Sequence, residues 1–271
     1  MKGFAIHYSF EFLSGIRNRT LLLMNYLMPL GFYLLMGSMM PGINPFFADQ
    51  MIPAMAIFAI LSGTIMGLPT PLVEAREGQV LRTYRVHGVP APSLLAIPAL
   101  STSVHVGGVC AIIAATAPLL FGVEGPTSLP AYASILAAFT FAVAGMGSLI
   151  GVVSSGSKVA ILWQQLIYLP SMILGGLMIP LDILPDIFFR IAHLLPTTYG
   201  MQALMGAAFG SPTPYPPLGA ALVLLAGGSV AFGLAHYLFS WDDRNARRRA
   251  HPALALLAFL PYIAGALLLL S

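Results

Sequence analysis

Charged side chains are scarce in this 271-residue sequence, where Asp, Glu, Lys and Arg together make up only 8%. Soluble globular domains carry about 25%. Apolar residues make up 58% and come in long uninterrupted runs, which excludes an ordinary soluble domain and indicates a membrane protein. The runs also lack the alternation of polar and apolar positions that a membrane β-barrel requires. We therefore predict an all-α membrane protein.

A transmembrane helix needs about 20 mainly apolar residues, and six runs without Asp, Glu, Lys or Arg meet that length. These are residues 21–40, 52–73, 94–121, 131–153, 159–181 and 217–239. A seventh run, 252–270, is borderline at 19 residues and contains Pro261, which would kink a helix. An extra crossing and a re-entrant hairpin both fit, and we expect a seventh helix. One membrane domain then accounts for residues 1–271.

The N-terminal segment, residues 1–20, has no continuous apolar core after its lysine, so it does not resemble a cleaved signal peptide. Large apolar residues recur there every four positions, at Phe4, Tyr8, Phe12 and Ile16. This spacing places them on one face of a helix. We expect a helix lying on the membrane surface; the alternative is a disordered tail.

Lys and Arg collect in cytoplasmic loops because they resist translocation. With the N-terminus in the cytoplasm, all of the twelve Lys and Arg residues except Arg190 fall on the cytoplasmic side. We therefore expect a multi-pass protein of the cell (inner) membrane with a cytoplasmic N-terminus. A basic fringe beside anionic lipid headgroups explains the surplus of positive charge without a nucleic-acid partner.

Motifs for chemistry are also missing. Cys110 is the only cysteine, which rules out an internal disulfide and a cysteine metal site. The six histidines show no HExxH spacing, and no GxSxG serine elbow occurs. We predict no catalytic residue and no metal ligand. His105 lies inside an apolar run, either held by a neighbouring backbone group or hydroxyl, or lining a substrate route.

The nine carboxylates all fall in the tail or in connections between the apolar runs. An ion channel or proton-coupled carrier would more often place carboxylates inside its spans. If this protein moves a substrate uphill, the energy enters from elsewhere.

Charge is densest between the second and third runs, in residues 72–88. The charged residues there are Glu74, Arg76, Glu77, Arg82 and Arg85. From Glu74 to His87 the stretch has no proline and one glycine, so we expect a short helix that exposes both signs of charge. The alternative is an ordinary solvated loop.

Three stretches in order resemble the type-2 ATP-binding-cassette (ABC) exporter permeases. "VEAREGQVLRTYRVHGVPAPSLLA" at 73–96 is similar to the cytoplasmic coupling segment of that family. "LPSMILGGLMIPLDILPDIFFRIAHLLPTTYGMQALMGAAFG" at 169–210 resembles its late signature, and "IRNRTLLLMNYLMPLGFYLL" at 16–35 resembles its opening. The likeness reaches nearly the whole chain up to about residue 240.

The resemblance implies an interfacial helix (1–20), a six-helix core (21–240) and two permease subunits that meet in the lipid bilayer as a homodimer or heterodimer. It also implies a cytoplasmic ABC ATPase that binds a coupling segment, residues 73–89, through the five charged residues named above. The chain has no GxxxxGK[ST] phosphate loop. We therefore expect a separate ATPase subunit to bind ATP and Mg, and no cofactor on this chain.

The resemblance further implies an external hairpin, residues 182–200, that acts as a partial lid; its charged residues are Asp182, Asp186 and Arg190. The alternative is an interfacial loop without a gating role. A substrate route would pass the first, second and fifth helices, near Trp163, Gln164, Gln165 and Tyr168. Such side chains also commonly link helices by hydrogen bonds in lipid, which is the interpretation we favour slightly.

We therefore predict a non-catalytic permease subunit that exports a hydrophobic or amphipathic compound, drug-like or lipid. A membrane scaffold or sensor that transports nothing is the alternative, and an intramembrane enzyme using His105 is less favoured. The family usually stops after "SWDDRNARRRA", so the run at 252–270 departs from its pattern.

Overall fold

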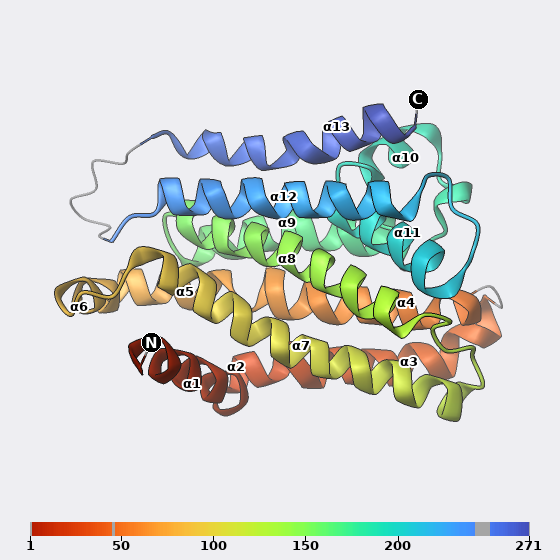
Figure 1. Ribbon diagram of the computed structural model, residues 1–271, viewed down its shortest axis with the longest axis horizontal. Helices are drawn as coiled ribbons and strands as arrows, with labels where there is room; N and C mark the ends of the chain where they lie inside the picture. Colours follow the sequence, from red (N-terminus) through yellow and green to blue (C-terminus); the bar gives the residue numbers. More distant parts are fainter. Residues whose placement is uncertain (1, 45–46, 242–249, 271) are drawn as a thin grey trace.

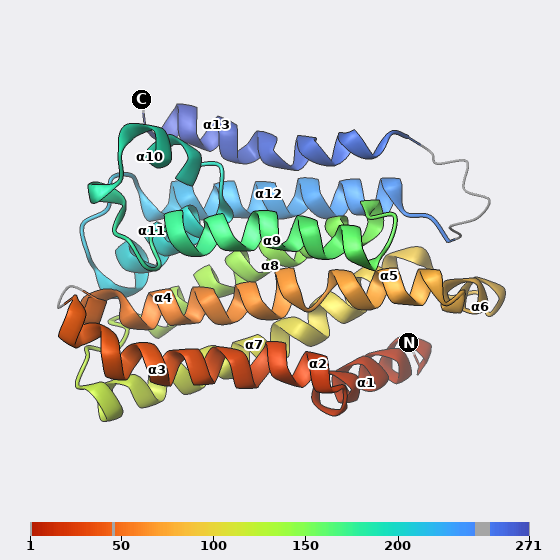
Figure 2. The same ribbon diagram turned by 180° about the vertical axis from the view of Figure 1, so that it is seen from behind.

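The computed structural model describes residues 2–44, 47–241 and 250–270. These residues form a bundle of helices without a β-strand (Figure 1), so the predicted all-α fold class is confirmed. Six helices in this part of the chain are long and apolar enough to cross a membrane. They lie side by side along the length of the bundle (Figures 1 and 2).

The first two crossings each contain a π-helical turn. Helix α2 (Arg19–Leu22), the turn η1 (Leu23–Leu27) and α3 (Met28–Ile43) make up the first. The second is α4 (Phe47–Leu61), the turn η2 (Ser62–Met66) and α5 (Pro69–Glu77). Helix α4 is the centre of the fold, since nearly all of its side chains are buried against α3, α7, α8 and α11.

The third and fourth crossings are α7 (Ala91–Phe121) and α8 (Leu129–Val153). Gly147 and Gly151 on α8 form a GxxxG pair that allows close packing. A Cβ atom at Gly147 would lie 2.7 Å from the Thr64 carbonyl oxygen, and one at Gly151 would lie 3.2 Å from the Pro69 Cα atom. Larger residues would push α8 away from the second crossing.

The predicted fifth crossing, 159–181, is shorter than expected. Helix α9 (Ser157–Leu174) packs against α5 and α8 within the bundle (Figure 2) but ends at Gly175, and Gly176 has a φ of +83°. A side chain at Gly175 would collide with Thr197. Helix α9 is not among the six candidate crossings, because Lys158 and two glutamines lower its hydropathy.

Residues 252–269 are helical, as expected for a seventh helix in the run 252–270. A 3₁₀ segment η4 (Pro252–Phe259) leads into α13 (Leu260–Leu269), and the two count as one candidate crossing. Pro261 lies in the first turn of α13, where its missing N–H is tolerated. The segment packs on α12 (Pro217–Leu238), whose Gly227 leaves room for the Tyr262 ring.

The predicted N-terminal helix is α1 (Lys2–Arg17), which precedes the first crossing and packs against α7. It lies near α6 (Val80–Val86) at one end of the bundle, whereas α13 finishes at the other end (Figures 1 and 2). A position on the membrane surface stays a prediction.

Candidate functional site

The predicted coupling segment is two helices rather than one. Helix α5 ends at Glu77, the chain turns through Gly78 and Gln79, and α6 begins at Val80. Gln79 has a φ of +61° and is the one non-glycine residue with positive φ among the described residues. Helix α6 projects at the end of the bundle (Figure 1). The expectation of one continuous helix is therefore wrong.

Arg76 is buried, with an exposed fraction of 5%. Its guanidinium donates a hydrogen bond of 2.9 Å to the carbonyl oxygen of Val152 and another to that of Ser154. These carbonyls are at the C-terminal end of α8, where helical carbonyls lack partners and the helix dipole attracts a cation. The expectation that Arg76 is exposed is therefore wrong: Arg76 caps α8.

Glu77 is bonded to the start of the next helix. Its carboxylate accepts hydrogen bonds from the Ser157 hydroxyl at 2.8 Å and from the Ser157 backbone N–H at 3.3 Å. An acidic group at a helix N-terminus is favourable because the first N–H groups are unpaired and the dipole is positive there. Arg76 and Glu77 together hold the turn between α8 and α9 against the end of α5.

The other three charged residues, Glu74, Arg82 and Arg85, are exposed. The Arg82 guanidinium donates to the Gln79 side-chain oxygen at 3.3 Å. The predicted cluster is thus divided between a pair bonded inside the subunit and a group that faces outward. Glu77 is exposed as well, but its carboxylate is already bonded to Ser157, so we expect the outward group to make the main contacts with another protein.

His105 is held on both ring nitrogens. Its Nδ1 lies 2.5 Å from the Tyr26 hydroxyl and its Nε2 lies 3.0 Å from the Phe12 carbonyl oxygen, while its ring stacks on Phe12. His105 therefore joins α7 to α1 and to the first crossing. This geometry agrees with the interpretation that neighbouring groups satisfy the histidine.

The predicted route residues do not come together. Gln164 is buried and donates to the Thr70 hydroxyl at 3.1 Å, and the Tyr168 hydroxyl lies 3.2 Å from that of Ser62. Both contacts link α9 to the second crossing. Trp163 is exposed and Gln165 is half-buried. The contacts of Gln164 and Tyr168 agree with the helix-linking interpretation.

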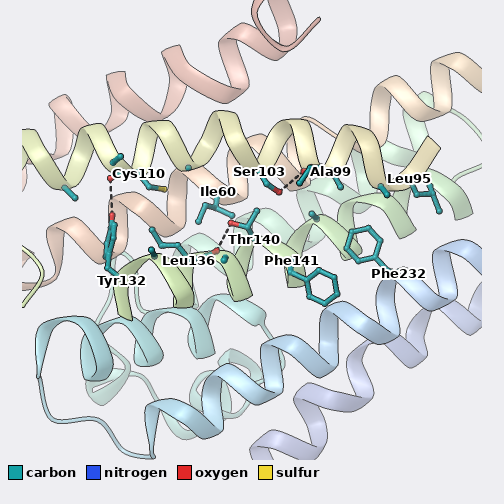
Figure 3. Close-up of a pocket in the computed structure, with 18 of the residues that line it drawn as sticks. Ile60, Leu95, Ala99, Ser103, Cys110, Tyr132, Leu136, Thr140, Phe141 and Phe232 are labelled. Atoms are coloured by element: carbon teal, nitrogen blue, oxygen red, sulfur yellow. Dashed lines mark hydrogen bonds between the residues drawn. The ribbon is translucent and has the colours of Figure 1, made fainter. Parts of the chain in front are cut away.

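An apolar groove between α7 and α8 was not predicted (Figure 3). It has a volume of about 1150 Å³ and a floor that includes Ile60 of α4. Small residues one helical turn apart line the α7 side: Ala96, Ala99, Ser103, Gly107, Ala111 and Ala114. This spacing was visible in the sequence, but it is equally typical of close helix packing.

Three hydroxyl groups along the groove are bonded within the protein. Tyr132 donates to the Cys110 carbonyl at 3.2 Å, and Ser103 and Thr140 donate to carbonyls of their own helices at 2.7 Å (Figure 3). The groove therefore presents mainly hydrocarbon to whatever enters it, with the exposed His236 of α12 as a further polar residue of the lining.

Comparison with known proteins decides the family. The model of the ABC-2 type transporter family matches residues 4–209, which include every predicted site residue. The chain belongs to the ABC-2 type transporter family. It is also similar to Nodulation protein J of Sinorhizobium fredii (strain NBRC 101917 / NGR234), at 30% identity over 78 residues. That match spans 29% of this chain and about a third (30%) of the length of the relative.

This ABC-2 chain is therefore a multi-pass membrane subunit of an ABC transporter, as the sequence resemblance implied. The family match ends at residue 209, within the last residues of α11 (Pro196–Phe209), so α12 and α13 lie beyond it.

In the ABC-2 chain the segment predicted as an external hairpin, residues 182–200, comprises most of the 3₁₀ turn η3 (Leu181–Ile183), α10 (Asp186–Ala192) and the start of α11; its external position stays a prediction. Asp186 and Arg190 are exposed, as are the apolar residues Ile187 and Ile191. The side chain of Asp182 lies outside the described part of the structure. His193, which follows α10, is fully buried; burial lowers its pKa, and a hydrogen bond to the Phe189 carbonyl partly offsets this.

Proposed function

We propose that this chain is the permease subunit of an ATP-driven exporter, and that a separate ABC ATPase docks on α5 and α6. Family membership supports the partnership with an ATPase. The observation that carries the docking site is the outward group, Glu74, Arg82 and Arg85, on a segment whose base is bonded to the rest of the bundle.

The bonded pair gives a physical route for force. A push on α6 reaches the end of α5, and Arg76 and Glu77 connect that end to α8 and α9 through hydrogen bonds. Packed helices transmit such displacements as rigid-body or shear motions. ATP-driven closure of the ATPase would then move the second crossing (α4 and α5), α8 and α9 as one unit.

The proposed cargo is hydrophobic or amphipathic, either drug-like or lipid. The apolar groove in Figure 3 supports this class because its lining is mainly hydrocarbon and the hydroxyls of Ser103, Tyr132 and Thr140 are already bonded. Two permease subunits, identical or different, would complete the transporter.

The orientation can be tested with one engineered thiol. Cys110 is buried, so Arg85→Cys would present the exposed thiol to a membrane-impermeant maleimide. We expect labelling in inside-out vesicles and none in intact cells, with Arg190→Cys at the external hairpin showing the reverse. Labelling of position 85 in intact cells would refute docking of a cytoplasmic ATPase there.

Assembly can be tested by purifying the tagged chain from its native membranes and measuring Mg-ATP hydrolysis and efflux in reconstituted vesicles. We expect an ATPase subunit to cross-link to a photoreactive residue at position 82 and not at position 190. An ATPase that cross-links only elsewhere would overturn the docking site.

A further inference from the structure

A second, smaller cavity is lined in large part by residues of α1, α5, α6 and α7. Figures 1 and 2 show these four helices close together toward one end of the bundle. We call the cavity the polar chamber. Its volume is about 130 Å³, whereas one water molecule needs about 10–15 Å³ of such space. It can therefore hold a small ion together with some of its hydration water.

Four polar residues line the chamber, Asn25, Ser101, Thr102 and Ser148, and the buried side-chain oxygen of Asn25 has no hydrogen-bond partner among the described residues. All four are more than nine-tenths buried, and Asn25 is only 1% exposed. Leaving buried polar groups unpaired is costly, and most such groups in proteins have a protein, water or ion partner. An occupant that binds oxygen atoms would give the Asn25 side-chain oxygen its missing partner.

Glu11 adds the charge. Its carboxylate lines the chamber and lies 3.6 Å from His7 Nε2. Burial raises the pKa of Glu11, and His7 partly offsets this. His7 stacks on Tyr84 of α6, and both line the same space. His105, the other titratable group of the chamber, already has both nitrogens in hydrogen bonds.

We propose that the polar chamber binds a small monovalent cation through the Glu11 carboxylate, the Asn25 amide oxygen and the hydroxyls of Ser101, Thr102 and Ser148. Carboxylate, amide and hydroxyl oxygens suit hard cations. One carboxylate matches one positive charge, and the described residues hold no group of three or more His, Cys, Asp or Glu that could take a metal ion through such ligands. The same chemistry fits Na⁺ or K⁺ and the ammonium group of an organic amine.

This proposal does not depend on export or on the ATPase. Its consequence is mechanical, because the chamber borders α1, α6 and α7, which belong to three parts of the chain. A cation held between them would tie the coupling segment to the N-terminal helix.

The test is the thermal unfolding of the purified full chain in detergent at constant chloride concentration. We compare NaCl, KCl and methylammonium chloride with the chloride of N-methyl-D-glucamine, which is too large for the chamber. An occupant bound only by the folded state raises Tm. At about ten times Kd we expect a rise of about 2–4 °C. Comparing the rise in Tm in NaCl and KCl with that in methylammonium chloride shows whether the chamber prefers a metal ion or an organic ammonium group.

Glu11→Gln and Asn25→Leu should each abolish the cation-specific rise in Tm, and the exposed Glu74→Gln is the matched control that should keep it. Thr102→Val, a change of similar size, should weaken apparent affinity about tenfold and serves if the other variants fail to fold. Lowering the pH should shrink the rise, because protonation of Glu11 removes the negative charge. Equal Tm values of the unaltered chain in all four salts would overturn the proposal and leave ordered water only.

Discussion

The two halves of the charged segment differ in what their side chains touch. At the end of α5, Arg76 and Glu77 bond to the C-terminal end of α8 and the N-terminal end of α9. On α6, Arg82 and Arg85 face outward. In the sequence the two halves look alike, because each is rich in charged residues. A charged side chain in such a segment can therefore either bond to a neighbouring helix of the same subunit or contact a partner protein. The position of the neighbouring helix ends decides between the two.

The first way to break this comparison is Arg76→Gln. The variant loses charge-assisted hydrogen bonds to two buried carbonyls, so we expect the free energy of unfolding to fall by about 3 kcal/mol. Denaturant unfolding in mixed micelles, followed by circular dichroism, measures it. The matched Arg82→Gln variant should change it by less than about 0.5 kcal/mol. Equal losses in the two variants would show that Arg76 does not cap α8.

The second test is charge reversal on α6, with Arg82→Glu and Arg85→Glu combined. Like charges placed across an interface cost several kcal/mol, so we expect ATPase affinity to weaken by about 2 kcal/mol, or roughly 30-fold. Titration of the purified subunits measures this, and Tm should stay unchanged. Arg190→Glu, at the external hairpin, is the control. Unaltered affinity in the double variant would contradict docking on α6.

A double-mutant cycle of Glu77→Gln and Ser157→Ala sharpens the comparison at smaller scale. Because the carboxylate bonds to the Ser157 hydroxyl at 2.8 Å, we expect a coupling free energy of about 1 kcal/mol. Pairing Glu74→Gln with Ser157→Ala should give none. Additive effects of the first pair would show that the bond between Glu77 and the Ser157 hydroxyl does not stabilise the fold.

The smallest effect is expected at the turn that separates the two halves. Gln79 has a φ of +61°, and left-handed backbone costs a residue with a side chain about 1–2 kcal/mol. Gln79→Gly removes this cost, but glycine also has greater freedom in the unfolded chain, which offsets part of the gain. We therefore expect the free energy of unfolding to rise by about 0.5 kcal/mol. Gln79→Ala should bring no gain. A loss in the glycine variant would show that the Gln79 side chain matters more than its backbone.

The helical fold could be predicted because long apolar runs leave the backbone few ways to satisfy its hydrogen bonds in lipid. The N-terminal helix and the helix at 252–270 followed from spacing and composition. The family followed from three ordered stretches. Each of these properties is carried by residues that are close together in the chain.

The rest depends on contacts between distant residues. Arg76 is buried because it bonds to the Val152 and Ser154 carbonyls. Helix α9 ends at Leu174, just before Gly175, where a side chain would collide with Thr197. Predicting the groove would require the distance between α7 and α8, and a row of small residues in the sequence does not give that distance. The interpretation of Gln164 and Tyr168 as linking residues was available because their chemistry allows few alternatives in lipid.

Helix α1 begins toward one end of the bundle, and α13 finishes at the other. Short epitopes attached ahead of α1 and after α13 would therefore reside in different aqueous compartments. Antibody staining of intact cells would detect one epitope, and staining of permeabilised cells would detect both. The epitope detected in intact cells would give the orientation of the protein in the membrane without any knowledge of its cargo.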